Sequence, residues 1–348
     1  MLSKHKDDVY RMPAEWEKQK STWVAWPHNK KDWPNKFDLI PSVFAEIISK
    51  ICKFQKVNIL IENKKVKKEI YPLLKSFLAN TENISYKVCK TDRVWVRDSF
   101  PIFVKNRLNQ KILIDWGFNA WAKYKNFNLD NKICIKINNL LNLKSVKPKK
   151  NNRRIILEGG SIDVNGKGLL MTTRECLQSL IQERNPGITK KQYEKIFNQF
   201  LGIKKVLWLN KGIVGDDTHG HVDDIARFVN ERKIFIACEK NKSDANYNIL
   251  KENYKILKKY NKKNIFKIVK IPMPSPKYID NIRVPASYLN FYIANKIVLV
   301  PIFNDDKDIV VLKIFKKHFK KRTVIPIDCS LLIWGLGAIH CMTQQEPS

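Results

Sequence analysis

One pattern recurs along this chain: a polar motif with Gly or Pro leads into an apolar strand, a short turn and a second apolar strand. In the clearest copy, Asn165-Gly166 separates the apolar segments 162–164 and 169–172. An Asn-Gly pair supplies the positive φ angles of a tight hairpin. We expect two further hairpins, one over residues 225–237 and one turning at Ala294-Asn295, and a fainter fourth over residues 102–114.

Helix-like stretches lie between these hairpins, at residues 191–201 and 245–260, where apolar residues recur every three or four positions. Each hairpin-plus-helix unit can bury its faces only against its neighbours, which predicts a radial arrangement of the units. No Gly/Ser-rich or Pro-rich linker interrupts the sequence, so we expect a single domain spanning residues 1–348. The polar motifs would then meet on one axis, where chemistry is to be sought.

The length and composition describe a folded protein. With 348 residues, of which 44% are hydrophobic, the chain can bury a substantial core. It has no run of about 18 apolar residues, and residues 1–8 lack the apolar segment of a secretory signal. These observations predict a cytoplasmic protein without a membrane partner. The seven cysteines are scattered without a C-x-x-C pair, which argues against a disulfide framework and a zinc ribbon.

The formal net charge of +32 raises the alternative of a basic nucleic-acid-binding protein, because basic surfaces release counterions from a phosphate backbone. The lysines are spread over the whole chain, however, and accompany abundant Asn and Ile. Such a composition is typical of an AT-biased genome. We therefore rank specific nucleic-acid binding below an enzymatic function.

The densest polar cluster covers residues 215–224, at the start of a predicted strand. In an extended segment residues two apart share a face, so His221 and Asp223 would point the same way. The run from Thr218 to Asp224 resembles the T-H-x-H-x-D-H zinc run of the metallo-β-lactamase fold, which makes a metal-dependent hydrolase an alternative. Here Asp224 replaces the last histidine, and the histidines outside this cluster form no second ligand-like pair.

A second candidate for chemistry lies near the C-terminal end, where two glycines precede His340 and Cys341. A free thiol beside His340 or His221 would form a nucleophile-and-acid pair. Asp98, Glu158 and the His221/Asp223 pair stand at the starts of repeat units, so a radial fold would bring three carboxylates to this thiol. Converging carboxylates in a basic protein suit a cationic ligand, and a planar guanidinium matches paired carboxylates well.

Six motifs, in this order along the chain, make the sequence resemble the agmatine deiminases. They are 12–16 (MPAEW), 23–29 (WVAWPHN), 115–121 (DWGFNAW), 157–161 (LEGGS), 215–223 (GDDTHGHVD) and 339–345 (IHCMTQQ). The resemblance implies an α/β fold, the five-fold pseudosymmetric α/β propeller known as the pentein fold. It also implies hydrolysis of agmatine to N-carbamoylputrescine and ammonia, a step of polyamine and putrescine biosynthesis.

The resemblance also implies a role for each candidate residue. Cys341 matches the nucleophile, His221 the acid/base and Glu158 the carboxylate that orients it, while Asp98 and Asp223 match the pair that grips the guanidinium. The reaction would pass through a covalent thiouronium intermediate and would need no metal and no organic cofactor. The only partner implied is the small-molecule substrate, and a homo-oligomer is compatible with this reading.

The sequence departs from the family at two positions before the nucleophile. Related sequences read G-G-G-N-I-H-C there, whereas this chain has Leu336 at the second glycine and Ala338 at the asparagine. A leucine at positive φ would cost about 1–2 kcal/mol. Strain of that size would misplace Cys341, so we expect Leu336 to adopt a negative φ.

Overall fold

The computed structural model describes residues 9–348, in which helices and small mixed sheets alternate. The N-terminal segment 1–8, on which the expected lack of a secretory signal depends, lies outside the described residues. Within the part of the chain that is described, no helix is long and apolar enough to cross a membrane.

Four sheets share one topology, in which an antiparallel hairpin is followed by a strand parallel to its second member. Their strands are β4 (Ile102–Lys105), β5 (Lys111–Ile114) and β6 (Ser145–Val146); β9 (Asp163–Val164), β10 (Leu169–Thr173) and β11 (Lys205–Leu209); β12 (Ala226–Asn230), β13 (Lys233–Cys238) and β14 (Lys267–Pro272); and β17 (Tyr292–Ala294), β18 (Ile297–Ile302) and β19 (Thr323–Asp328). All four expected hairpins are therefore confirmed.

Helices connect the second and third strands of these sheets: α4 (Ile133–Leu141), α5 (Arg174–Gln178) with α6 (Lys190–Leu201), α7 (Asn246–Tyr260) and α8 (Asp308–His318). The two helices expected from periodicity correspond to α6 and α7. Helix α6 illustrates the local causes, because a capping box of Thr189 and Gln192 begins it and Gly202, at φ +71°, ends it. Its apolar stripe, with Tyr193 and Phe197 fully buried, packs into the core.

The fifth sheet joins the two ends of the described chain, and the sequence did not indicate it. Its order is β20-β1-β2-β3, with β20 (Gln344–Pro347) antiparallel to β1 (Gln19–Ala25) and β1 parallel to β2 (Lys56–Ile61) and β2 to β3 (Ile84–Val88). Helices α1 (Ile40–Ile51) and α2 (Lys67–Ser76) connect its parallel strands. The strands β20, β1 and β2 repeat the topology of the other four units.

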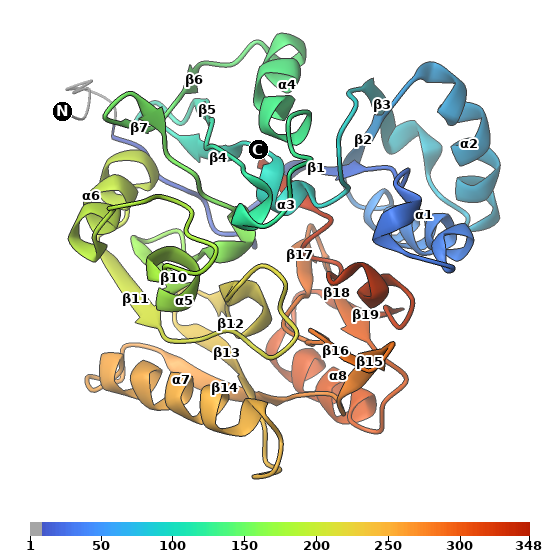
Figure 1. Ribbon diagram of the computed structural model, residues 1–348. Coiled ribbons are helices and arrows are strands. Elements are labelled where there is room, and N and C mark those ends of the chain that lie inside the picture. The colour runs from blue at the N-terminus through green and yellow to red at the C-terminus, as the bar shows by residue number, and fades with distance from the viewer. Residues whose placement is uncertain (1–8) are drawn as a thin grey trace.

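Figure 1 shows the five sheets around a common centre, in chain order, with helices such as α7 and α8 toward the outside. None of the sheets among residues 9–348 closes on itself. Besides short 3-10 helices, the described chain also contains the short helix α3 (Val96–Ser99) and two small hairpins, β7 (Lys149–Lys150) with β8 (Arg153–Arg154) and β15 (Lys277–Ile279) with β16 (Ile282–Val284).

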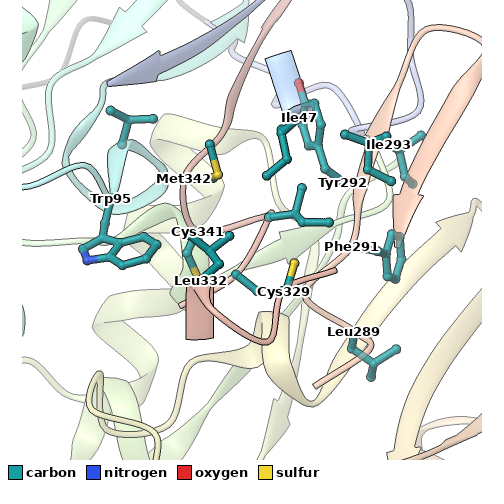
Figure 2. Packing of buried hydrophobic residues seen from close by; sticks show 14 of the residues in the cluster. Ile47, Trp95, Leu289, Phe291, Tyr292, Ile293, Cys329, Leu332, Cys341 and Met342 are labelled. Carbon is teal, nitrogen blue, oxygen red and sulfur yellow. The ribbon is translucent and has the colours of Figure 1, made fainter. Parts of the chain in front are cut away.

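The larger hydrophobic cluster contains residues from several of the units and packs around the C-terminal segment. Edge-to-face contacts of Phe315 with Phe235 and Phe291, each with ring centroids 5.1 Å apart, tie α8 to β13 and to the segment before β17. Figure 2 shows Cys341 and Met342 within this cluster, together with Trp95 and Leu332. The segment that carries Cys341 is therefore packed in the core, although it lies only a few residues from the chain end.

Candidate active site

Each of the five units places a polar residue of interest just before its first strand. Asp98 precedes β4, Glu158 precedes β9, His221 precedes β12, Asn290 precedes β17 and Cys341 precedes β20. All five side chains are buried. Contacts between these residues bring the polar motifs together, as the repeat pattern predicts.

Cys341 lies in the wall of a cavity of about 540 Å³ that also reaches Asp98. Its Sγ accepts a hydrogen bond from Asn290 Nδ2 at 3.0 Å and lies 4.0 Å from Asp223 Oδ2. The Cys341 carbonyl accepts a hydrogen bond from the Arg97 amide at 3.1 Å, which anchors the backbone. The thiol is therefore positioned from two sides and faces the cavity.

His221 lies between two carboxylates. Its Nδ1 is 3.8 Å from Asp98 Oδ2, and its Nε2 is 3.9 Å from Glu158 Oε2. Neither ring nitrogen has a hydrogen-bond partner. Arg184 holds Glu158 in place, because its Nε donates to Glu158 Oε1 at 3.0 Å. His221 is thus a buried imidazole with both nitrogens available for proton transfer.

The backbone around His221 differs from the expected extended segment, and that expectation was wrong. Residues Val222–Asp224 form a 3-10 turn. Asp216 causes the bend, because its Oδ2 accepts the amides of Gly220 at 2.8 Å and His221 at 2.9 Å while Gly220 adopts φ +97°. His221 and Asp223 nevertheless both reach the site, because the turn aims them there.

Gly160 explains why these side chains come so close. A Cβ at this position would lie 2.6 Å from His221 Nδ1, 2.9 Å from Asp98 Oδ1 and 3.0 Å from Asp223 Oδ2. Its amide also donates to Asp98 Oδ1 at 3.0 Å. The motif at residues 157–161 therefore contributes space as well as the Glu158 carboxylate.

The two aspartates expected to grip the substrate are held by different partners. Trp121 Nε1 donates to Asp98 Oδ2 at 2.9 Å. Asp223 Oδ2 contacts His340 Nδ1 at 2.7 Å, whereas Asp223 Oδ1 is buried without a partner. Each carboxylate thus has a fixed orientation, and Asp223 keeps one oxygen free.

Burial sets the electrostatics of the site. Burial and the neighbouring Glu158 raise the pKa of Asp98 to about 7. Burial, with Asp224 and Asp98, raises the pKa of Asp223 well above its ordinary value, and burial with Asp223 does the same to the pKa of the Cys341 thiol. Burial and Arg184 lower the pKa of His221. A cation entering the cavity would favour ionisation of both aspartates and of the thiol.

One group of metal-ligating side chains occurs among the described residues. Glu158, Cys176 and His221 bring one ligand atom each within 4.8 Å of one another. This group differs from the zinc-like run considered in the sequence, since His219 Nε2 pairs instead with Ser179 Oγ at 3.0 Å. One oxygen of Glu158 is already occupied by Arg184.

Leu336 adopts φ +65°, so the expectation of a negative φ was wrong. The 3-10 helix Leu332–Gly335 ends here, and the Leu336 amide donates to the Ile333 carbonyl at 2.9 Å. On either side the backbone lies against indole rings. A Cβ at Gly335 would be 2.6 Å from Trp33, and one at Gly337 would be 2.7 Å from Trp95. Gly335 and Gly337 therefore have no room for a side chain, and the left-handed residue stands between them.

Several residues of the site were missed or given no role in the sequence. Asn290 belongs to a polar motif before a hairpin, so the repeat pattern indicated its position. The pattern did not indicate its hydrogen bond to the Cys341 thiol. Glu15 lies in one of the six family motifs but carried no role. Arg184 had no sequence signal for its partner Glu158, because the contact joins segments distant in the chain. His340 was considered only as a partner of the thiol, whereas its ring contacts Asp223 and Glu15.

Comparison with known proteins identifies the family. A model of the Porphyromonas-type peptidyl-arginine deiminase family matches residues 11–347. The chain belongs to this family. Among curated relatives of this deiminase-family chain, a Mycoplasma capricolum protein provisionally named agmatine deiminase is 32% identical, over 100% of this chain and 98% of the relative. A Legionella pneumophila (strain Paris) protein with the same provisional name is also 32% identical, over 97% and 95%.

Solved structures agree with that assignment. An Enterococcus faecalis agmatine deiminase has a TM-score of 0.88 at 26% identity, covering 100% of both chains. A C. jejuni agmatine deiminase with substrate bound, in which a cysteine is replaced by serine, has a TM-score of 0.88 at 27% identity, covering 99% of this chain and 98% of that one. An amidinotransferase from Microseira wollei, 13% identical with a TM-score of 0.51 and covering 97% and 96%, shares the fold alone. The α/β fold of this deiminase-family chain is thus the pentein fold of these proteins.

Proposed function

We propose that this protein is an agmatine deiminase, which hydrolyses agmatine to N-carbamoylputrescine and ammonia. The observation that carries the proposal is the buried Cys341 thiol, which shares a cavity with Asp98 and lies 4.0 Å from Asp223 Oδ2, while His221 lies between Asp98 and Glu158. We further propose that the five matching units form a five-fold pseudosymmetric α/β propeller. Their shared topology supports this arrangement, with one polar residue of the site before the first strand of each unit.

Binding of the guanidinium is the first step. Asp98 and the free oxygen of Asp223 accept its N–H groups, and the permanent positive charge offsets the desolvation and mutual repulsion of the two carboxylates. The same charge lowers the pKa of the Cys341 thiol, which burial and the carboxylates raise in the empty site. The substrate thereby helps to ionise its own attacker.

Covalent chemistry follows from this arrangement. His221 takes the proton of the thiol, and Cys341 Sγ adds to the guanidinium carbon. His221 then gives this proton to the departing ammonia as the C–N bond breaks, which leaves a thiouronium on Cys341. Neutral His221, oriented by Glu158, next takes a proton from water as the water attacks the thiouronium carbon. The C–S bond then breaks as the C=O bond of the ureido product forms, and the hydroxyl proton of the adduct leaves to solvent. His221 returns its proton to the Cys341 thiolate, which restores the thiol for the next cycle.

The outer part of the cavity suits a chain with a second positive charge. Aromatic side chains line it, and so do the carboxylates of Asp32 and Asp217. Two basic residues also line the cavity: Arg93 is paired with Asp32 at 3.0 Å and lies 4.2 Å from the centroid of the Tyr124 ring, and Lys31 is exposed. This lining supports agmatine over arginine as the substrate, and we infer that the reaction belongs to polyamine and putrescine biosynthesis.

The test is incubation of the purified protein with agmatine, with ammonia and the ureido product measured. We expect turnover by the wild type and none by Cys341→Ala. Cys238→Ser is the matched control, because Cys238 is half-buried at the end of β13 and outside the cavity, and it should retain full activity. Intact-mass analysis of protein quenched during turnover should show an adduct on Cys341.

Three outcomes would change the proposal. Turnover of free arginine without turnover of agmatine would move the substrate assignment. Activity that is lost in EDTA and restored by zinc would favour the metal-dependent alternative. Full activity of Cys341→Ala would overturn the cysteine mechanism.

A further inference from the structure

His340 lies between two buried carboxylates and does not line the cavity. Its Nδ1 is 2.7 Å from Asp223 Oδ2, and its Nε2 is 2.8 Å from Glu15 Oε2. Its own amide donates to Asn290, which also contacts the Cys341 thiol. His340 therefore joins the N-terminal segment to a carboxylate of the site without approaching the substrate itself.

Glu15 determines which nitrogen of His340 carries a proton. Burial alone would raise the pKa of Glu15, but Arg227, His340 and Arg97 together hold it well below its ordinary value. Arg227 donates to Oε1 at 3.0 Å and Arg97 to Oε2 at 3.3 Å. An ionised carboxylate can only accept hydrogen bonds, so the 2.8 Å contact requires a proton on His340 Nε2.

The contact with Asp223 then requires one more proton. If Nε2 carries the only ring proton, Nδ1 of the neutral ring has a lone pair and no proton. An ionised Asp223 Oδ2 also offers only lone pairs, and two such atoms would repel each other at 2.7 Å. Either His340 is an imidazolium and Asp223 a carboxylate, or His340 is neutral and Asp223 a carboxylic acid. One proton is therefore shared by this pair.

The surroundings decide where that proton rests in the empty site. Burial and the two arginines disfavour a cationic His340, while burial and the neighbouring aspartates favour a protonated Asp223. The proton thus rests on Asp223. The charged and titratable groups that face the pair are Glu15, Arg97, Arg227, Asp163, Asp98, Asp224, His221 and Cys341.

We infer that His340 is a positioning residue that takes this proton when the guanidinium binds. The inference rests on the proposed function. As the cation reaches the free Oδ1 of Asp223, the O–H bond at Oδ2 breaks and an N–H bond forms at His340 Nδ1. Asp223 then meets the substrate as a carboxylate, and Glu15 stabilises the new imidazolium. No proton has to leave for solvent from this buried pair.

The direct test is ¹⁵N NMR of histidine-labelled Cys341→Ala protein, with and without agmatine, using His340→Gln to assign the signals. We expect one protonated and one bare nitrogen on His340 in the free protein, and two protonated nitrogens in the complex. Unchanged His340 signals on saturation with agmatine would overturn the inference. This test needs neither turnover nor a stable His340 variant.

The kinetic test compares pH profiles of kcat/KM for agmatine. In His340→Gln the Asp223 proton has to reach solvent, so the acid limb should move up by about one pH unit or more, and part of the loss should be recovered at high pH. Glu15→Gln should shift the profile in the same direction. His318→Gln, on the outer helix α8, and Glu17→Gln are the matched controls.

These experiments distinguish a failure of the inference about His340 from a failure of the proposed function. A merely structural role for His340 predicts a uniform loss of kcat/KM at every pH, with the acid limb unmoved, and this result would overturn the inference alone. Absence of agmatine turnover and binding in the wild type would instead contradict the proposed function. If His340→Gln does not fold, the pH profile of Glu15→Gln and the His340 NMR signals still test whether His340 takes the proton.

Discussion

Asp98 is the residue whose ionisation most directly limits activity. With a pKa raised to about 7 by burial and Glu158, it is largely protonated in acid, when it cannot accept both N–H groups of a guanidinium. We therefore expect kcat/KM of the wild type to rise toward a plateau above about pH 7. Asp98→Asn should lose about 2–5 kcal/mol of transition-state stabilisation, the range for breaking a buried charge pair. A loss of tenfold or less in kcat/KM would contradict this role.

The same residue predicts how stability changes with pH. The folded protein keeps the Asp98 proton between pH 3.8 and about 7, whereas the unfolded chain has lost it. The free energy of unfolding contributed by Asp98 therefore falls as pH rises through this window. In Asp98→Asn the group cannot titrate, so Tm should fall less between pH 5 and pH 8 than in the wild type. An equal fall in both proteins would show that Asp98 is ionised throughout.

The turn before the nucleophile gives a prediction for one element. Leu336 ends the 3-10 helix Leu332–Gly335 at φ +65°, a conformation that asparagine tolerates and that β-branched residues do not. Asn is close in shape to leucine and Val is smaller by one carbon atom, so the difference between Leu336→Asn and Leu336→Val reports mainly the backbone preference of each residue. We expect the Asn variant to be more stable than the Val variant by about 1 kcal/mol or more, measured by urea unfolding.

The activities of these two variants address the departure from the family motif. Leu336 lines the cavity, and the glycines beside it hold the turn against Trp33 and Trp95, so the turn is already fixed in the wild type. Neither substitution should raise kcat. A large rise in either variant would show that the leucine limits the natural enzyme. Equal stability of the two variants would indicate that the turn is not left-handed in solution.

At the scale of the whole molecule, Glu346 ties three parts of the chain together. It lies in β20 and accepts hydrogen bonds from Ser21 at 2.7 Å, Trp23 at 3.1 Å and Lys111 at 2.6 Å. Because Cys341 lies just before β20, Glu346→Gln should lower both stability and kcat. The expected loss of stability is on the order of 2 kcal/mol or more. Glu231→Gln, which affects an exposed pair with Lys167, should change neither.

Acid should remove the stabilisation that Glu346 provides. Burial alone would raise its pKa, but hydrogen bonds from Lys111 and Ser21 hold the pKa below its ordinary value of 4.5. Its contribution is therefore present above the pKa of the unfolded chain and is lost as pH falls. The Tm values of wild type and Glu346→Gln should therefore converge as the pH falls below 4.5 and through the lowered pKa of folded Glu346. A difference in Tm that persists in acid would contradict the ionic account.

Local patterns in the sequence determined the parts of the fold that depend on neighbouring residues. The Asn165-Gly166 turn, the alternating strands beside it and the periodic helices α6 and α7 all follow from short-range preferences, and all are present. The order of the polar motifs along the chain also carried the resemblance to agmatine deiminases, and the family assignment confirms that resemblance.

Only the tertiary structure decided which distant segments meet. The pairing of β20 with β1 joins residues more than 300 positions apart, and no local preference encodes it. The contacts of Glu15 and Asp223 with His340 likewise depend on packing. Leu336 adopts a positive φ against the preference of leucine itself, in a turn whose flanking glycines pack against two tryptophan rings. Sequence determines local conformation where the free energy is local, and buried contacts decide the rest.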